Sequence, residues 1–161
     1  MVIGRRTNVK LNSSDNLYHP SSVTRVARER GELFFVKGED YFFIARNAYP
    51  WQYIPDLVIA RNGYDNFVVA VAIENKVSVI DATATLLALH QTDDEGNFAG
   101  ASHRKDKRIN RKIIRDKRRF HFSSGFTSSA PYETINVNKN LDKKMTIIVK
   151  KRKRLSKITA E

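Results

Sequence analysis

Cysteine is missing from this 161-residue chain, which excludes disulfide bonds and zinc sites built from thiolates. The four histidines (His19, His90, His103 and His121) are too scattered to indicate a metal cluster. No apolar run approaches the roughly 20 residues of a membrane span, and the N-terminus lacks the apolar core of a signal peptide. We therefore expect a soluble, cytoplasmic protein that uses no cofactor and has no membrane partner.

The motifs of common enzymes are also absent. No hydrolase triad is evident, and Gly31, Gly38 and Gly63 stand singly at turns instead of forming a loop that cradles phosphate. These absences give no indication of a small-molecule substrate. The hydrophobic fraction of 41% is nevertheless compatible with a real core, and the length suits one ordinary domain or two small ones.

Positive charge is distributed unevenly along the chain. Residues 1–100 contain ten Lys/Arg and twelve Asp/Glu, a net charge of −2, whereas residues 101–161 contain nineteen and five, a net charge of +14. Such an asymmetry is typical of a segment that binds a polyanion, although a solvated basic surface without a partner is the alternative. We therefore predict a β-rich domain over residues 1–98 and a strongly basic, DNA-binding region over residues 99–161.

The pattern of apolar residues and turn formers predicts an α+β fold. Ser21 or Ser22 can cap a helix that stops at Gly31, and Asp81 can cap another over residues 82–91. The Asn62-Gly63 dipeptide is a strong signal for a turn between two strands. The expected strands are a hairpin over 32–46, the pair 57–61 and 67–73, residues 76–81, and a C-terminal hairpin over 134–149.

Residues 103–120 are expected to form a basic helix with ten basic and two acidic side chains. Ile109, Ile113 and Phe120 fall close together on a helical wheel, so a narrow stripe can dock while the rest stays cationic. Like charges four residues apart, such as Arg104 and Arg108, would weaken the isolated helix, and bound phosphates would remove that penalty. The segment is therefore suited to lie against an anion.

A second basic cluster occupies residues 150–154. Asn110 on the basic helix could contact a base edge, although a solvated asparagine is the alternative. We predict that the two clusters contact the phosphates of nucleic acid through Arg104, Lys105, Lys107, Arg108, Arg111, Lys112, Arg115, Lys117, Arg118, Arg119, Lys150, Lys151, Arg152, Lys153 and Arg154. Because phosphate contacts position a protein without reading sequence, little base readout is expected.

An enzymatic interpretation rests on Asp56, Glu74 and Lys76, which resemble the PD-(D/E)xK pattern of metal-dependent endonucleases. In such sites carboxylates share a cation and a lysine stabilises charge on the phosphate. If Asn62-Gly63 forms a two-residue turn, Asp56 and Glu74 lie on opposite faces, roughly 17 Å apart along the strands. A longer loop would bring Glu74 to within about 7 Å as a diagonal neighbour. A nuclease therefore remains the alternative to a non-enzymatic protein.

Residues 56–81 also resemble a KOW-type segment of the small SH3/Tudor-like barrels in transcription and ribosomal proteins. The similarity comprises an apolar strand, a polar turn with Gly63, a long apolar strand and the sequence NKVSVID. Tyr64, Asp65 and Asn66 depart from it, because the family has basic, glycine-rich residues after the turn. The resemblance implies a small N-terminal barrel, and it leaves RNA binding as a further alternative. Its core candidates are Phe34, Phe42, Ile44, Val58, Val69 and Val79.

The whole chain, from its small basic build to its lysine-rich end, resembles the MotB-type early proteins of T4-like phages. The resemblance implies a viral, non-enzymatic protein that binds double-stranded DNA early in infection. It would influence transcription or nucleoid organisation during takeover of the host, in the host cytoplasm or nucleoid. Host nucleoid or transcription proteins would then be further partners.

Overall fold

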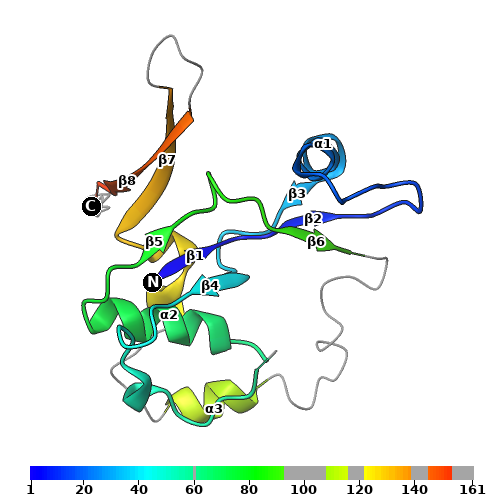
Figure 1. Ribbon diagram of the computed structural model, residues 1–161. Helices are drawn as coiled ribbons and strands as arrows, with labels where there is room; N and C mark the ends of the chain where they lie inside the picture. The colour runs from blue at the N-terminus through cyan, green and yellow to red at the C-terminus, as the bar shows by residue number, and fades with distance from the viewer. Residues whose placement is uncertain (60, 93–107, 116–121, 139–144, 154–161) are drawn as a thin grey trace, which may run out of the picture.

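The computed structural model describes residues 1–59, 61–92, 108–115, 122–138 and 145–153, and their fold is α+β, as expected (Figure 1). The helices are α1 (Pro20–Arg30), α2 (Tyr64–Glu74) and α3 (Ile109–Arg115), with short 3-10 helices η1 (Trp51–Tyr53), η4 (Phe122–Gly125) and η5 (Thr127–Ser129). The strands are β1 (Val2–Gly4), β2 (Thr7–Val9), β3 (Glu32–Leu33), β4 (Tyr41–Phe43), β5 (Ile80–Asp81), β6 (Leu89–Gln91), β7 (Tyr132–Asn138) and β8 (Met145–Lys151).

The larger sheet has the strand order β4-β1-β5-β7-β8. β1 runs parallel to β5 and antiparallel to β4, β5 runs parallel to β7, and β7 and β8 form the expected C-terminal antiparallel hairpin. Strands from both sides of the predicted boundary near residue 98 therefore belong to one sheet. The boundary stays a prediction, but removing the basic region would also remove two strands of this sheet.

The smaller sheet, in the order β3-β2-β6, corrects two expectations. The predicted hairpin over 32–46 is wrong, because β3 pairs with β2 and β4 pairs with β1 in the other sheet. Arg6, which lies between β1 and β2, holds the segment that connects β3 to β4. Its backbone N–H and its guanidinium both donate to Asp40. The predicted helix over 82–91 is also wrong, since its end forms β6, parallel to β2. Asp81 accepts bonds from the N–H and hydroxyl of Thr83, which favours a turn over a helix.

The helix expected over residues 21–30 is confirmed as α1. It starts one residue earlier, with Pro20 at a first-turn position where a missing N–H is tolerated, and not with a serine cap. Gly31 follows its last residue, as expected, and the Gly31 N–H donates to the Ala27 carbonyl at 2.9 Å.

Helix α2 replaces the second strand of the predicted pair, 67–73, and the described residues of the first, 57–59 and 61, form no strand. Gly63, with a φ of 91°, precedes the helix, so the Asn62-Gly63 signal marks a helix start and not a hairpin. An apolar run is ambiguous between a buried strand and a buried helix, and here all residues from Phe67 to Ala72 are buried in a helix. The hairpin of the KOW-type resemblance is therefore not formed, and an SH3-like barrel is not confirmed.

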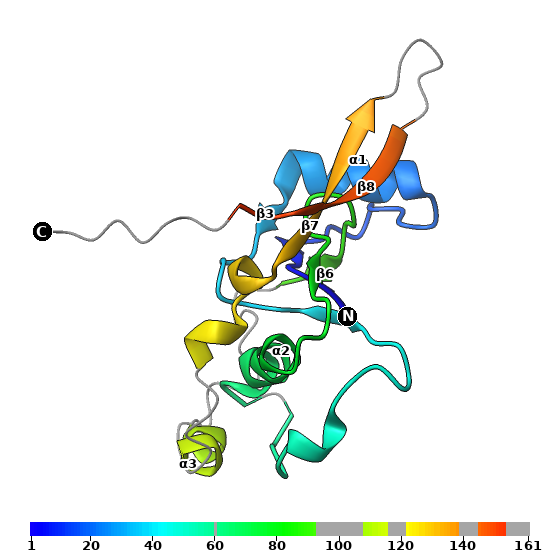
Figure 2. The ribbon, with the colours of Figure 1, turned by 90° about the vertical axis from the view of Figure 1, so that its left-hand side faces the viewer.

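The hydrophobic core surrounds α2, which Figure 2 views nearly end-on. Of the six core candidates, Val69 and Val79 are fully buried, Phe42 and Ile44 pack against the core, Phe34 is half-buried and Val58 is exposed. The Tyr49 hydroxyl donates to the Val68 carbonyl at 2.7 Å. Gly125 of η4 lies so close to α2 that an added Cβ would be 1.7 Å from the Asn66 carbonyl oxygen. Segments from residues 1–98 and from residues 99–161 thus pack around the same helix, α2.

Candidate nucleic-acid interface

Helix α3 docks through one amide and one apolar side chain. Asn110 is fully buried, and its amide donates to the carbonyls of Val58 (2.9 Å) and Arg61 (3.1 Å) and accepts from the Val58 N–H (2.9 Å). Ile114 joins the hydrophobic core. The hypothesis that Asn110 contacts a base edge is therefore wrong, and so is its solvated alternative, because the amide is used inside the protein.

The buried side of α3 differs from the predicted stripe. Ile109 is exposed, Ile113 is half-buried, and Phe120 lies outside the described residues. Docking is thus displaced around the helix by one position, toward Asn110 and Ile114. An asparagine on a docking face has no distinctive sequence signal, since the same residue is common on solvated helices.

Four cations lie on the side of α3 that faces away from the core. Arg108, Arg111, Lys112 and Arg115 follow the i, i+3, i+4, i+7 spacing of one helix face, and all four are exposed. Among the described residues none of these four side chains has an ion-pair or hydrogen-bond partner. The basic face predicted from the sequence is therefore available to an external anion along α3.

The ribbon formed by β7 and β8 projects from the body of the protein (Figures 1 and 2). Lys150, Lys151 and Lys153 are exposed where β8 returns to the body, and within the described ranges they too lack side-chain partners. The structure therefore presents a second basic cluster at the base of the ribbon.

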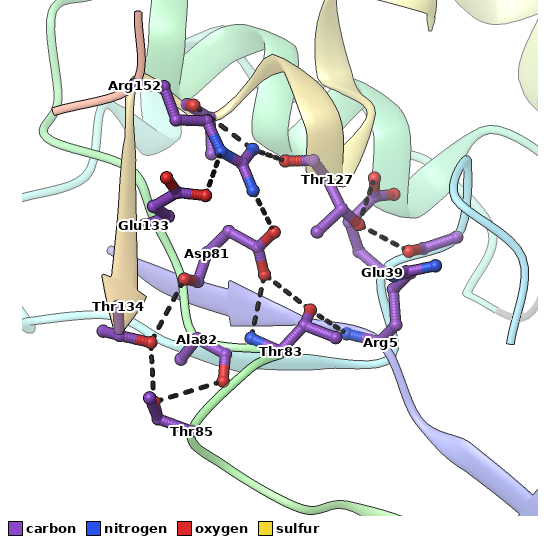
Figure 3. A network of polar contacts seen from close by, with 12 residues as sticks. Arg5, Glu39, Asp81, Ala82, Thr83, Thr85, Thr127, Glu133, Thr134 and Arg152 are labelled. Carbon is purple, nitrogen blue, oxygen red and sulfur yellow. Dashed lines mark hydrogen bonds and ion pairs between the residues drawn. The ribbon is translucent and has the colours of Figure 1, made fainter. Parts of the chain in front are cut away.

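Arg152, in contrast, is held by internal contacts, which Figure 3 shows. Its guanidinium donates to Asp81 at 2.5 Å, to Glu133 at 3.1 Å and to the Thr127 carbonyl at 2.8 Å. Asp81 is buried, so the pair ties the end of β8 to β5. The prediction that Arg152 contacts phosphate is corrected accordingly, because its guanidinium is used inside the protein. This pair has no local signal in the sequence, because 71 residues separate its members.

The described parts of the two clusters lie apart. In both Figure 1 and Figure 2, α3 lies at one end of the molecule, beyond α2, and β8 lies toward the other end. The other predicted contacts lie outside the described residues; they are Arg104, Lys105, Lys107, Lys117, Arg118, Arg119 and Arg154.

A buried acid lies between the first turn of α2 and η5. Glu39 accepts hydrogen bonds from the Asn66 amide at 2.7 Å and from the Thr127 hydroxyl at 3.3 Å. Burial, with the nearby charge of Asp65 as a smaller cause, raises the pKa of Glu39 to about 8. Burial and the charge of Asp40 raise the pKa of Asp65 to about 6. The pKa of Glu39 therefore lies well above its ordinary value, and its carboxyl group links the first turn of α2 to η5.

The arrangement expected for a nuclease does not form. Asp56 is exposed in the connection before α2, Glu74 is the last residue of α2, and Lys76 follows the helix with a φ of 60°. The two carboxylates therefore do not face each other across paired strands, and Glu74 and Lys76 share no strand face. An 11-residue helix, about 16 Å long, replaces the strand that the pattern requires.

The described residues include no helix with the length and apolar character needed to cross a membrane. Within the same ranges, no group of three or more Asp, Glu or His side chains is arranged to hold a metal ion. Comparisons of the chain with protein-family models, with curated proteins and with solved structures give no match.

Proposed function

We propose that this protein binds double-stranded DNA, without catalysis, through phosphate contacts from α3 and from the base of the β7–β8 ribbon. One observation carries the proposal: seven exposed cations in the described parts of these two elements have no internal partner. They are Arg108, Arg111, Lys112, Arg115, Lys150, Lys151 and Lys153. As the MotB-type resemblance implies, binding would modulate transcription or nucleoid organisation in the host cytoplasm.

The energetic reason for an anionic partner is clearest on α3. Arg108 and Lys112, and likewise Arg111 and Arg115, stand four residues apart, and such like-charge pairs destabilise a helix by a few tenths of a kcal/mol each. Duplex DNA presents about one negative charge per 1.7 Å of its axis, so bound phosphates would reverse the sign of this effect. Because Asn110 and Ile114 already fix the opposite side, the helix can bind DNA without leaving the core.

The proposal is tested by neutralising each cluster separately. The variant R108Q/R111Q/K112Q/R115Q neutralises α3, and K150Q/K151Q/K153Q neutralises the ribbon base. Affinity for a duplex of about 30 base pairs is measured by fluorescence anisotropy between 50 and 200 mM salt. The slope of log K against log salt should fall by about 0.9 for each phosphate that a variant no longer neutralises. Since the clusters are far apart, the effects of the two variants should add.

A matched control is R28Q/R46Q/K76Q, which removes three exposed cations from residues 1–98. It changes the net charge as much as the ribbon-base variant does and should leave the slope close to wild type. Equal decreases in all three variants would reduce the proposal to a general effect of net charge. If a structured RNA competes for the protein better than duplex DNA does, RNA would become the proposed partner in place of DNA. Deletion of residues 99–161 is unsuitable, because it would remove β7 and β8 from the larger sheet.

A further inference from the structure

We propose that two copies of this chain associate through their β8 strands, which pair antiparallel about Ile148 and join two five-stranded sheets into one. The proposal concerns the outer edge of the ribbon and is independent of DNA binding. It rests on three features of β8: an unpaired edge, an exposed apolar centre, and a sequence that is complementary to itself when reversed.

The first feature is the free edge. β8 is the last strand of the larger sheet as described, and its only neighbour there is β7. The Arg152 N–H donates to the Pro131 carbonyl at 2.9 Å, so the even-numbered residues of β8 direct their main-chain groups toward β7. By alternation, the N–H and C=O groups of residues 145, 147, 149 and 151 point outward. They form a ready template for another strand.

The second feature is that the centre of this edge is apolar and exposed, with the lysines Lys150 and Lys151 confined to one end. Ile147, Ile148 and Val149 are 56%, 37% and 56% exposed, and the seven-residue strand has no proline. Its register with β7 is continuous, without a bulge. In Figure 1 no described helix or strand lies beyond the outer edge of β8. Natural proteins seldom leave a long apolar edge strand uncovered, because it pairs with other chains.

The third feature selects the occupant. When β8 is paired antiparallel with itself about Ile148, Ile147 lies opposite Val149 of the second copy and Thr146 lies opposite Lys150. Apolar residues thus meet apolar residues. The two Lys150 residues stand four positions apart along the strands, about 14 Å, so the like charges do not face each other. All four outward-facing residues can pair, giving about eight main-chain hydrogen bonds between the copies.

The charge of the whole chain predicts how salt affects the association. Each copy has a net charge of +12, so two copies repel at low ionic strength. At 0.15 M salt the Debye length is about 8 Å and most of this repulsion is screened. Dimerisation should therefore strengthen as salt rises, whereas DNA binding through phosphates should weaken. The opposite dependence separates the two properties in experiment.

The association is tested with the full chain, without DNA, by sedimentation equilibrium over a range of concentrations. The wild type should show a monomer–dimer equilibrium. I147K/V149K places lysines opposite lysines in both central pairs and should raise the dimer dissociation constant about tenfold or more. V36K/I59K is the matched control, with the same residue types, the same charge change and exposed positions elsewhere, and should dimerise like wild type. A wild type that stays monomeric at every concentration would overturn the proposal. The same holds if the monomer instead binds a strand of another protein.

A second experiment tests the register. The chain contains no cysteine, so Ile148→Cys introduces a single thiol at the proposed two-fold axis. Opposite residues in an antiparallel pair fall within the Cα–Cα range of a disulfide, so mild oxidation should give a covalent dimer. Val149→Cys, whose two copies would be offset by two residues, and Ile59→Cys, which is exposed elsewhere, should crosslink at least tenfold more slowly. Equal crosslinking rates in the three variants would contradict pairing about Ile148.

Discussion

Helices α2 and α3 contribute to the same hydrophobic core by opposite means. α2 supplies six consecutive buried residues, from Phe67 to Ala72, and is apolar on every side. α3 supplies Ile114 and a polar residue, Asn110, and four cations lie on its outer face. Burial holds α2 in place. Three hydrogen bonds from Asn110 to the segment that precedes α2 help to hold α3. A helix fixed by so few residues can use the rest of its surface for binding.

The largest expected effect comes from removing burial at α2. Phe67→Ala should lower the free energy of unfolding by about 3–5 kcal/mol, because it removes a fully buried ring and leaves a cavity. Urea unfolding followed by circular dichroism measures the change. Phe43→Ala, at an exposed phenylalanine of β4, is the control and should cost less than about 1 kcal/mol. Similar decreases in both variants would contradict the central place given to α2.

A smaller effect is expected at the anchor of α3. Asn110→Ala removes the side-chain partner of the Val58 N–H and carbonyl, whereas the Arg61 carbonyl still accepts from the Tyr64 N–H at 3.2 Å. The change should cost about 2–3 kcal/mol. Hydrogen exchange at α3 should increase more than at α2. Asn136→Ala, at an exposed asparagine of β7, should change stability by less than about 0.5 kcal/mol. Unchanged stability together with an altered base preference in Asn110→Ala would restore the readout hypothesis.

The smallest effect concerns the acid beside the first turn of α2. Because burial raises the pKa of Glu39 to about 8, the unfolded chain releases this proton at lower pH than the folded protein does. The free energy of unfolding should therefore fall as pH rises from about 5 to 8. Glu39→Gln cannot ionise and should remove about 2 kcal/mol of the decrease between pH 5 and about 6.5, measured by urea unfolding at these two pH values. An identical pH profile in the variant would show that Glu39 is already ionised when folded.

The same two helices show what could be predicted from the sequence. The basic helix is predictable because its charges exclude burial, although its docking residue is not, since one amide at position 110 leaves no periodic signal. The strand predicted in place of α2 has a physical reason: a uniformly apolar run has no periodicity, and Asn62-Gly63 favours a hairpin. The sequence could not indicate which sides of that segment are buried. Ile3 of β1 and Phe42 of β4 share its core, and η4, far along the chain, packs against it.

Local signals succeeded where the interactions are local. The α+β class, α1 and the β7–β8 hairpin follow from turn residues and nearby apolar positions, and the described cations of the two basic clusters are exposed as expected, with the exception of Arg152. Long-range pairing was not accessible. Contacts between distant parts of the chain have no signal in the neighbouring residues. Examples are the pairing of β4 with β1 and of β6 with β2, and the bond between Asp81 and Arg152.

The bond between Asp81 and Arg152 has a consequence for synthesis on the ribosome. Asp81 is buried at the centre of the larger sheet, but its guanidinium partner is made 71 residues later, after β7 and β8. A nascent chain that closed around β1 and β5 early would enclose an unpaired carboxylate, which is costly. We expect the sheet to close only once residue 152 has left the exit tunnel, so that chaperones meet an incomplete fold until then.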